Sequence, residues 1–223
     1  MLFVTNNSSA VLEDQEAALQ RIGIPAVGDV LTSAQAAATL VQAGERVVVL
    51  GSEGIRQAVR AVGAVVVDVS DTEAPADAVI VGWHRDFNYE GLQRAATAVL
   101  RGARLIGTND DATYPTPDGP IPGGGSILAA VATASGCEPL IAGKPFEPMA
   151  ELVRQRIGTG RLEDAVMVGD RPSTDGRFAL TLGCRYAHVE SGVTGPGDSV
   201  VPAPTLRGAN LAAIADQLLV TDG

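Results

Sequence analysis

The 223-residue sequence is poor in aromatic side chains, which make up 4% of the chain. Its 46% hydrophobic content rests mainly on alanine, valine, leucine and isoleucine. This composition argues against an aromatic-rich β-sandwich and favours helices packed on buried β-strands. A chain of this length can bury one large core or two smaller ones. The composition therefore predicts a folded α/β protein with room for an inserted domain.

Basic residues are also scarce, which leaves a formal net charge of -10 at pH 7. A negative surface repels the phosphates of nucleic acids and of anionic membranes, and no basic stripe interrupts it. We therefore expect no nucleic-acid partner and no membrane partner. A small phosphorylated ligand stays compatible with this charge if one or two cations and a metal ion set the local field.

The sequence also has few cysteines and lacks long apolar runs. Cys137 and Cys184 lie far apart, form no C-x-x-C motif and have small apolar neighbours, which favours buried free thiols over a disulfide. No apolar run reaches transmembrane length, and the residues after Met1 form no signal peptide. These features predict a protein of the reducing cytoplasm.

Short β-branched runs alternate with Ala- and Leu-rich amphipathic stretches along the chain. The hydrophobic period changes each time, which predicts repeated βα units, parallel sheets, and ligands beyond the carboxyl ends of the strands. The predicted strands are residues 2–4, 46–50, 64–69, 78–82, 104–106, 140–142, 165–168 and 184–188. The predicted helices are residues 11–22, 33–43, 55–62, 89–101, 126–135, 148–157, 174–182 and 210–219. Glycines suited to left-handed C-caps follow seven of these helices, at positions 23, 44, 63, 102, 136, 158 and 183.

Two stretches break this alternation. Residues 114–125 are rich in proline and glycine, which favours turns and predicts a return between domains. Residues 190–204 are predicted to form a surface loop before the last helix.

Polar residues follow the first predicted strand as Thr5-Asn6-Asn7-Ser8-Ser9. Hydroxyl, amide and backbone N–H groups at the end of a strand are suited to holding a phosphoryl oxygen. The alternative is an ordinary N-cap for the next helix, which residue type alone favours.

Charged residues follow two later strands. Lys144, between Gly143 and Pro145, would be a fixed point charge for a phosphate or for clustered carboxylates, although an ordinary surface lysine is the alternative. The apolar run 166–168 leads through a glycine to Asp170, and Asp175 comes five positions later. Mg²⁺ binds a few carboxylate oxygens and water, so these aspartates predict a metal site. Asp175 could instead cap the helix that begins nearby.

These three motifs together resemble the haloacid dehalogenase superfamily. They are similar to its motifs two, three and four, which correspond in this order to T-N-N-S-S, G-K-P and G-D-R-x-x-T-D. Three segments between these motifs are similar to those of the NagD-like, p-nitrophenyl phosphatase branch (class IIA). They are residues 81–90, Thr108-Asn109-x-Asp111 and residues 122–126. Members of this branch carry a C2-type cap between motifs two and three. The resemblance implies a Rossmann-like parallel-sheet core, residues 1–36 and 114–223, with an inserted α/β cap, residues 37–113.

The resemblance also implies functional roles. Thr5, Asn6 and Asn7 would bind the phosphoryl group of the substrate, with Thr5 and Asn6 among the catalytic residues. Lys144 would neutralise this group and the nucleophile. Asp170 would hold Mg²⁺, and Asp175 would support the metal's shell or Lys144. The implied activity is Mg²⁺-dependent hydrolysis of a small phosphorylated metabolite, in a protein that could form a homodimer through its cap.

The superfamily's first motif, D-x-D-G, has no counterpart, since no D-x-D occurs in the sequence. In the family its first aspartate forms an aspartyl-phosphate and its second is the general acid and base. Asp68-Val-Ser-Asp71 has the wrong spacing and is interpreted as a solvated strand end. We considered a start assigned too late or a shortened chain, a decayed pseudo-phosphatase, and a chain completed by another subunit. We favour the first, and keep an inactive phosphate- or Mg²⁺-binding regulatory protein as the alternative function.

Overall fold

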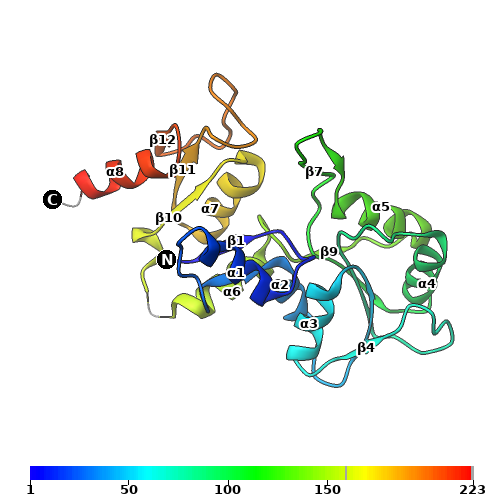
Figure 1. Ribbon diagram of the computed structural model, residues 1–223. Coiled ribbons are helices and arrows are strands. Elements are labelled where there is room, and N and C mark those ends of the chain that lie inside the picture. Colours follow the sequence, from blue (N-terminus) through cyan, green and yellow to red (C-terminus); the bar gives the residue numbers. More distant parts are fainter. Residues whose placement is uncertain (159, 222–223) are drawn as a thin grey trace. The chain divides into compact units, whose positions relative to one another are not determined.

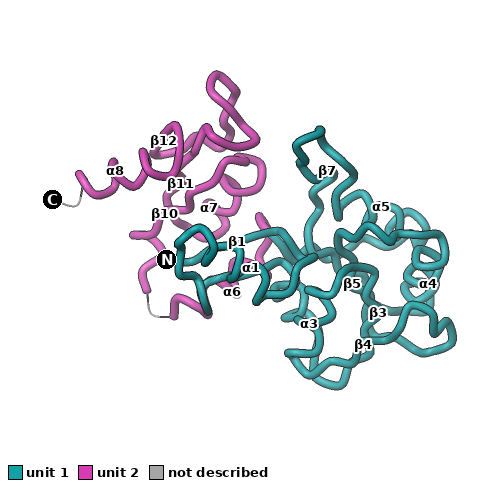
Figure 2. The backbone as a smooth tube through the Cα atoms, viewed as in Figure 1, with its two compact units in different colours: residues 1–143 teal, residues 144–223 magenta. Residues whose placement is uncertain are grey.

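The computed structural model describes residues 1–158 and 160–221. The chain divides into two compact units, residues 1–143 and residues 144–223 (Figures 1 and 2). Helices connect parallel strands in both units, so the predicted α/β class is confirmed. Each unit is described separately.

Unit 1 is built on a five-stranded parallel sheet with the strand order β4-β3-β5-β6-β9. Its strands are β3 (Arg46–Leu50), β4 (Val65–Val67), β5 (Ala78–Val81), β6 (Arg104–Gly107) and β9 (Leu140–Ile141). Its helices are α1 (Leu12–Arg21), α2 (Ser33–Ala38), α3 (Glu53–Ala61), α4 (Tyr89–Leu100) and α5 (Gly124–Ser135). A parallel pair, β1 (Phe3–Thr5) with β2 (Val30–Thr32), and an antiparallel ribbon, β7 (Thr113–Tyr114) with β8 (Ile121–Pro122), complete it.

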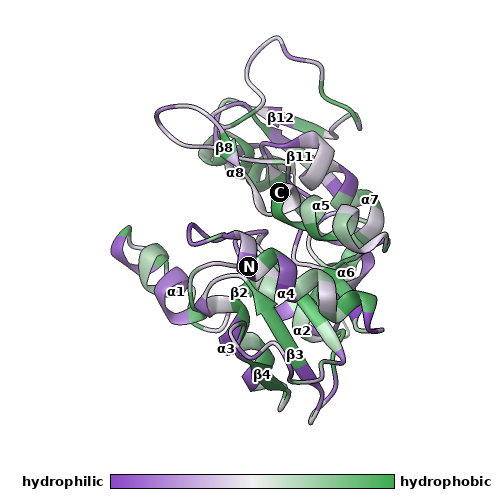
Figure 3. Cartoon of the chain, turned by 90° about the vertical axis from the view of Figure 1, so that its right-hand side faces the viewer, coloured by the Kyte–Doolittle hydropathy of each residue, from purple (hydrophilic) through white to green (hydrophobic). Residues whose placement is uncertain are grey.

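The central strands of unit 1 are buried on both faces. Successive side chains of a strand point to opposite faces of the sheet. Val48 and Val79 belong to an apolar cluster with α4 and α5, while Val47 and Ile80 point to the opposite face and are also fully buried. Strand β3 is accordingly hydrophobic over most of its length (Figure 3). Polar groups are therefore confined to the ends of these strands.

Unit 2 contains a three-stranded parallel sheet with the order β10-β11-β12. Its strands are β10 (Val166–Gly169), β11 (Arg185–Val189) and β12 (Leu206–Gly208). Its helices are α6 (Glu147–Ile157), the 3₁₀ turn η1 (Leu162–Asp164), the π-helical turn η2 (Pro172–Gly176), α7 (Arg177–Leu182) and α8 (Leu211–Thr221). Residues 190–204 hold no helix or strand, as the sequence predicts.

All seven glycines predicted as C-caps have positive φ, from 62° to 105°. The helix predicted over residues 33–43 is shorter, because α2 ends at Ala38. Strands β2 and β12 were not predicted. Each has three residues and lies directly before a helix or a bend, so neither shows the alternation by which a strand is recognised.

The predicted cap, residues 37–113, lies inside unit 1 together with β1 and β2. Hydrogen bonds explain this grouping: the Gly54 amide of α3 donates to Ser9 O (3.1 Å), and Gln57 Nε2 of α3 donates to Glu13 Oε2 (2.6 Å). The division into packed units thus differs from the predicted core and cap, whose boundaries stay a prediction.

The structure also bears on the predictions made from the scarcity of cysteine and of long apolar runs. Both cysteines are free thiols, as predicted, although each is only partly buried. No helix in residues 1–158 and 160–221 is both long and apolar enough to cross a membrane.

A glycine in the first turn of α3 fixes the approach of this helix to residues 8–10. A Cβ on Gly54 would lie 2.3 Å from Ala10 O and 2.7 Å from Ser8 O. Helices ordinarily favour alanine over glycine, but Gly54→Ala should lower the free energy of unfolding by about 1–3 kcal/mol because rigid backbone must move. Gly91→Ala in α4 is the control, since its Cβ would meet side chains and no backbone, with Leu50 Cδ1 at 2.9 Å and Asn88 Oδ1 at 3.2 Å. Urea denaturation of both variants measures the difference, and equal stabilities would contradict this account.

Candidate functional site

The predicted site residues divide between the two units. Thr5, Asn6 and Asn7 lie at the carboxyl end of β1 in unit 1, while Lys144 and the two aspartates lie in unit 2.

Side chains within residues 5–9 satisfy the backbone of their own loop. Thr5 Oγ1 accepts from the Asn7 amide at 3.0 Å. Asn7 Oδ1 accepts from the Ser9 amide at 3.0 Å and from Ser9 Oγ at 2.7 Å. Such bonds stiffen a turn. The 5–9 loop is therefore held by its own polar side chains.

The N-cap alternative for this loop is wrong. Helix α1 begins at Leu12 after Val11, which makes no side-chain cap hydrogen bond. The Leu12 amide donates instead to Gln57 Oε1 of α3, at 2.9 Å.

Asn6 is bonded by side chains from distant segments. Its carbonyl oxygen accepts from Asn109 Nδ2 at 2.9 Å and from Ser33 Oγ at 2.8 Å. Its side-chain Nδ2 donates to Asp111 Oδ2 at 3.1 Å. A Cβ on Gly143 would lie 2.6 Å from Asn6 Oδ1, so only glycine fits at this position. The sequence offered one signal for these contacts, the Thr108-Asn109-x-Asp111 motif, to which we assigned no role.

In unit 2, Lys144 and Asp175 form a buried ion pair, with 2.7 Å between Nζ and Oδ1. Their side chains are 10% and 7% exposed, so Lys144 is not an ordinary surface lysine. Asp175 Oδ2 accepts from the Arg171 amide at 3.1 Å. A Cβ on Gly169 would lie 2.3 Å from Asp175 Oδ2, so glycine permits this approach. Asp175 thus supports Lys144 and also bonds the residue that precedes its own helical turn, η2.

Asp170 stands at the end of β10. Its Oδ2 accepts from the Val193 amide at 2.7 Å, and its carbonyl oxygen accepts from the Thr194 amide at 3.3 Å. A Cβ on Gly192 would lie 2.0 Å from Asp170 Oδ2, so this loop passes very close to the carboxylate.

The donor chemistry of unit 2 fits magnesium better than a metal held by protein ligands alone. Within the described part of the chain, no three His, Cys, Asp or Glu side chains gather as a metal-binding group. Mg²⁺ is commonly held by one or two carboxylates, water and substrate phosphate. Asp170 and Asp175 can supply such a set.

A buried polar chain lies beside these aspartates. Tyr186 Oη is 3.3 Å from Gly169 O and 3.1 Å from His188 Nδ1, and His188 Nε2 is 3.2 Å from Thr194 O. His188 is fully buried. Burial raises the pKa of Tyr186, and the negative charges of Asp175 and Asp170 raise it further. A neutral phenol therefore links β10 to the loop that contacts Asp170.

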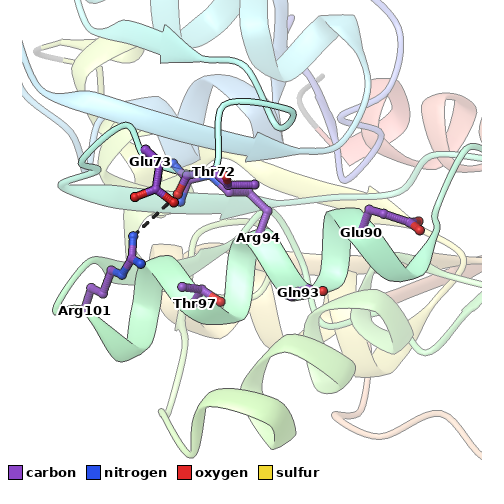
Figure 4. A pocket seen from close by; sticks show the side chains of 7 residues that line it. All are labelled: Thr72, Glu73, Glu90, Gln93, Arg94, Thr97 and Arg101. Atoms are coloured by element: carbon purple, nitrogen blue, oxygen red, sulfur yellow. Dashed lines mark hydrogen bonds between the residues drawn. The ribbon is translucent and has the colours of Figure 1, made fainter.

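A cavity of about 290 Å³ lies along α4 in unit 1, and none of the predicted site residues lines it (Figure 4). Arg94 in its wall is 3% exposed, and its Nη2 donates to Ala74 O at 2.8 Å. Its Nε is buried without a partner among the described residues, and burial lowers the Arg94 pKa while Asp71 opposes this. Arg101 Nη1 donates to Thr72 O at 3.4 Å. Both arginines thus hold the 72–74 segment through backbone carbonyls.

Two family models match the chain, a haloacid dehalogenase-like hydrolase model over residues 1–65 and a HAD-hydrolase-like model over residues 141–214. The D-glycerol 3-phosphate phosphatase of Mycobacterium tuberculosis is 38% identical over 92% of this chain, which spans 58% of that relative's length. The acid sugar phosphatase of Staphylococcus saprophyticus is 35% identical over 94% of this chain and 82% of its own.

Solved structures share the fold. The glycerol phosphate phosphatase of Mycobacterium tuberculosis in complex with magnesium superposes with a TM-score of 0.87 and is 37% identical, over 96% of this chain and 66% of that one. The Rossmann-like class implied by the sequence is thereby confirmed.

Removal of one partner from the Lys144–Asp175 pair should strongly destabilise unit 2. Asp175→Ala removes the carboxylate that lies 2.7 Å from the buried Lys144 ammonium group, so we expect a loss of about 3–5 kcal/mol in the free energy of unfolding. Glu163→Ala is the control. The side chains of Arg161 and Glu163 are 70% and 66% exposed, so their ion pair should contribute at most about 1 kcal/mol. Chemical denaturation followed by circular dichroism measures both, and similar small losses would contradict the buried-pair account.

Tyr186 should remain protonated at a pH at which an ordinary tyrosine, with a pKa of about 10, is ionised. Its folded-state pKa is raised, so above pH 10 the folded protein binds more protons than the unfolded chain and its stability falls as pH rises. Absorbance at the phenolate band should show one fewer ionised tyrosine at about pH 11 than after denaturation. Tyr186→Phe should abolish that difference. A variant that keeps it would refute the assignment to Tyr186.

Proposed function

Because the chain belongs to the NagD-like branch of the haloacid dehalogenase-like hydrolases, we propose that it is part of a Mg²⁺-dependent phosphomonoesterase for a small phosphorylated metabolite. The relatives found are phosphatases, including those for glycerol phosphate and acid sugar phosphates. The observation that carries the proposal is the buried Lys144–Asp175 ion pair, in the unit where Asp170 directly follows strand β10. A buried cation positioned by a carboxylate is suited to a transferred anionic group.

Each predicted residue has a role in this proposal. Thr5, Asn6 and Asn7 bind phosphoryl oxygens, and the internal bonds of their loop support a fixed geometry. Lys144 neutralises the phosphoryl group, and Asp175 orients Lys144 through the bond at 2.7 Å.

Asp170 is the principal metal ligand, and Asp175 stands in its outer shell. The Val193 amide holds one oxygen of Asp170, which orients the carboxylate. When bound, Mg²⁺ supplies positive charge that stabilises the phosphoryl group in its transition state.

The nucleophile is an aspartate that forms an aspartyl-phosphate, and it lies outside the 223 residues because D-x-D does not occur in them. A longer form of the protein or a second chain would supply it. The same proposal includes a cytoplasmic location and a homodimer formed through residues 37–113.

The second candidate is a binding or regulatory protein that takes up phosphate and Mg²⁺ without turnover. The observation in its favour is the missing D-x-D. The retained Lys144, Asp170 and Asp175 favour the enzyme, because a protein without activity has less use for a complete charged set.

Hydrolysis of p-nitrophenyl phosphate with and without Mg²⁺ separates the two candidates. We expect activity only in a version extended upstream to the preceding in-frame start, if that extension encodes D-x-D-G. In the active version, Lys144→Met and Asp170→Asn should each lower kcat by about 10²–10³, while Asp164→Asn, at an exposed position of unit 2, should not.

Each outcome decides between the candidates. No activity in either length would favour the binding protein. Activity in the 223-residue chain would refute our placement of the nucleophile, and full activity of Asp170→Asn would refute the metal assignment.

A further inference from the structure

The backbone of Asn6 is fixed from outside its own loop. Its carbonyl accepts two hydrogen bonds, from Asn109 Nδ2 at 2.9 Å and from Ser33 Oγ at 2.8 Å. Ser33 is fully buried and Asn109 is 5% exposed. Two bonds to one carbonyl, from two buried side chains, leave the Asn6 peptide group little freedom to rotate.

Asn109 can make these contacts in one orientation only. Its Nδ2 donates to Asn6 O, and its Oδ1 accepts from the Asp111 amide at 3.1 Å. A flipped side-chain amide would set a donor against a donor and an acceptor against an acceptor. Asn109 therefore joins the turn after β6 to the 5–9 loop in a defined register.

Asp111 completes the link by accepting from Asn6 Nδ2 at 3.1 Å. A carboxylate beside a loop that binds phosphate is unfavourable by charge alone, because like charges repel. Its hydrogen bond explains its presence, since an ionised acceptor holds an amide more strongly than a neutral one. The negative charge of Asp111 lowers the affinity of the loop for an anion, while its hydrogen bond preserves the geometry of the Asn6 side chain.

The segment that carries both residues is itself well anchored. Thr108 is fully buried, and its Oγ1 lies 3.0 Å from Ser8 Oγ. A Cβ on Gly143 would lie 2.4 Å from Thr108 O. Residues 108–111 thus form a rigid support for the 5–9 loop.

We propose that Asn109 and Asp111 are positioning residues for phosphoryl binding, acting through Asn6. Asn109 fixes the Asn6 peptide group, and Asp111 fixes the Asn6 side chain. This inference rests on the proposed role of the 5–9 loop, but the link to Asn6 can be tested apart from that role.

The first test measures the link itself in the full 223-residue chain. The side-chain NH₂ of Asn6 gives a ¹H–¹⁵N pair whose exchange with water reports its hydrogen bond. Asp111→Ala should speed this exchange about tenfold, because one hydrogen bond of about 1 kcal/mol or more is lost. Asp111→Asn keeps an acceptor and should change it less. Asp118→Ala, at an exposed position outside residues 108–111, should change nothing.

The second test measures its consequence, with inorganic phosphate as the probe. We expect Asp111→Ala to raise the phosphate Kd about fivefold to tenfold, since the loop must be ordered on binding. Asp111→Asn should bind phosphate as well as the wild type or more tightly, because it keeps the acceptor and removes the repelling charge. A loss of affinity in Asp111→Asn equal to that in Asp111→Ala would overturn the positioning role.

The two tests fail in different ways. Unchanged exchange of the Asn6 amide in Asp111→Ala would overturn the proposed link. Absence of phosphate binding in the wild type would contradict the proposed function of the loop, while the exchange measurement would still decide the link. If Asp111→Ala does not fold, Asp111→Asn decides instead: weaker phosphate binding in it, with exchange of the Asn6 amide as slow as in the wild type, would overturn the proposal.

Discussion

Parallel strands buried on both faces are the constraint on which the five-stranded sheet of unit 1 depends. In β3 and β5 the side chains facing either side of the sheet are apolar and inaccessible, so no polar chemistry can lie along them. Polar residues are therefore displaced to the strand ends, where helices begin and backbone groups need partners. Asn6 after β1, Thr108 after β6 and Asp170 after β10 all occupy such positions. The polar residues of the candidate site thus lie at strand ends in both units.

The elements with clear hydrophobic periods were predictable from the sequence. Strands β3, β5 and β10 and helices α3 and α4 lie within two residues of the predicted ranges at nearly every end. The failures have physical causes. Strands β2 and β12 are too short to show a period, and the π-helical turn η2 contains Asp175, which bonds Lys144 and the Arg171 amide at once. Local sequence does not reveal such tertiary bonds.

The candidate site was predictable as a set of motifs and not as a set of contacts. The family resemblance of G-K-P and G-D-R-x-x-T-D implied that Asp175 could support Lys144, and Lys144 Nζ and Asp175 Oδ1 are 2.7 Å apart. Nothing in the local pattern joined Asn6 to Asn109 or Asp111, which follow more than 100 positions later. A contact of that range depends on how β1 and β6 are placed within unit 1, and a single sequence carries no direct record of it.

The arginines of α4 illustrate a different use of charge. Arg94 and Arg101 hold the acidic 72–74 segment through neutral carbonyl oxygens, and neither forms an ion pair within the described residues. Salt screens attraction between separated charges but leaves short bonds to a carbonyl largely intact. The anchoring of this segment therefore depends little on ionic strength, because it uses carbonyl oxygens in place of the Glu73 carboxylate. This edge of unit 1 is thus attached without an ion pair to either arginine, and its remaining negative charge disfavours contact with other acidic surfaces.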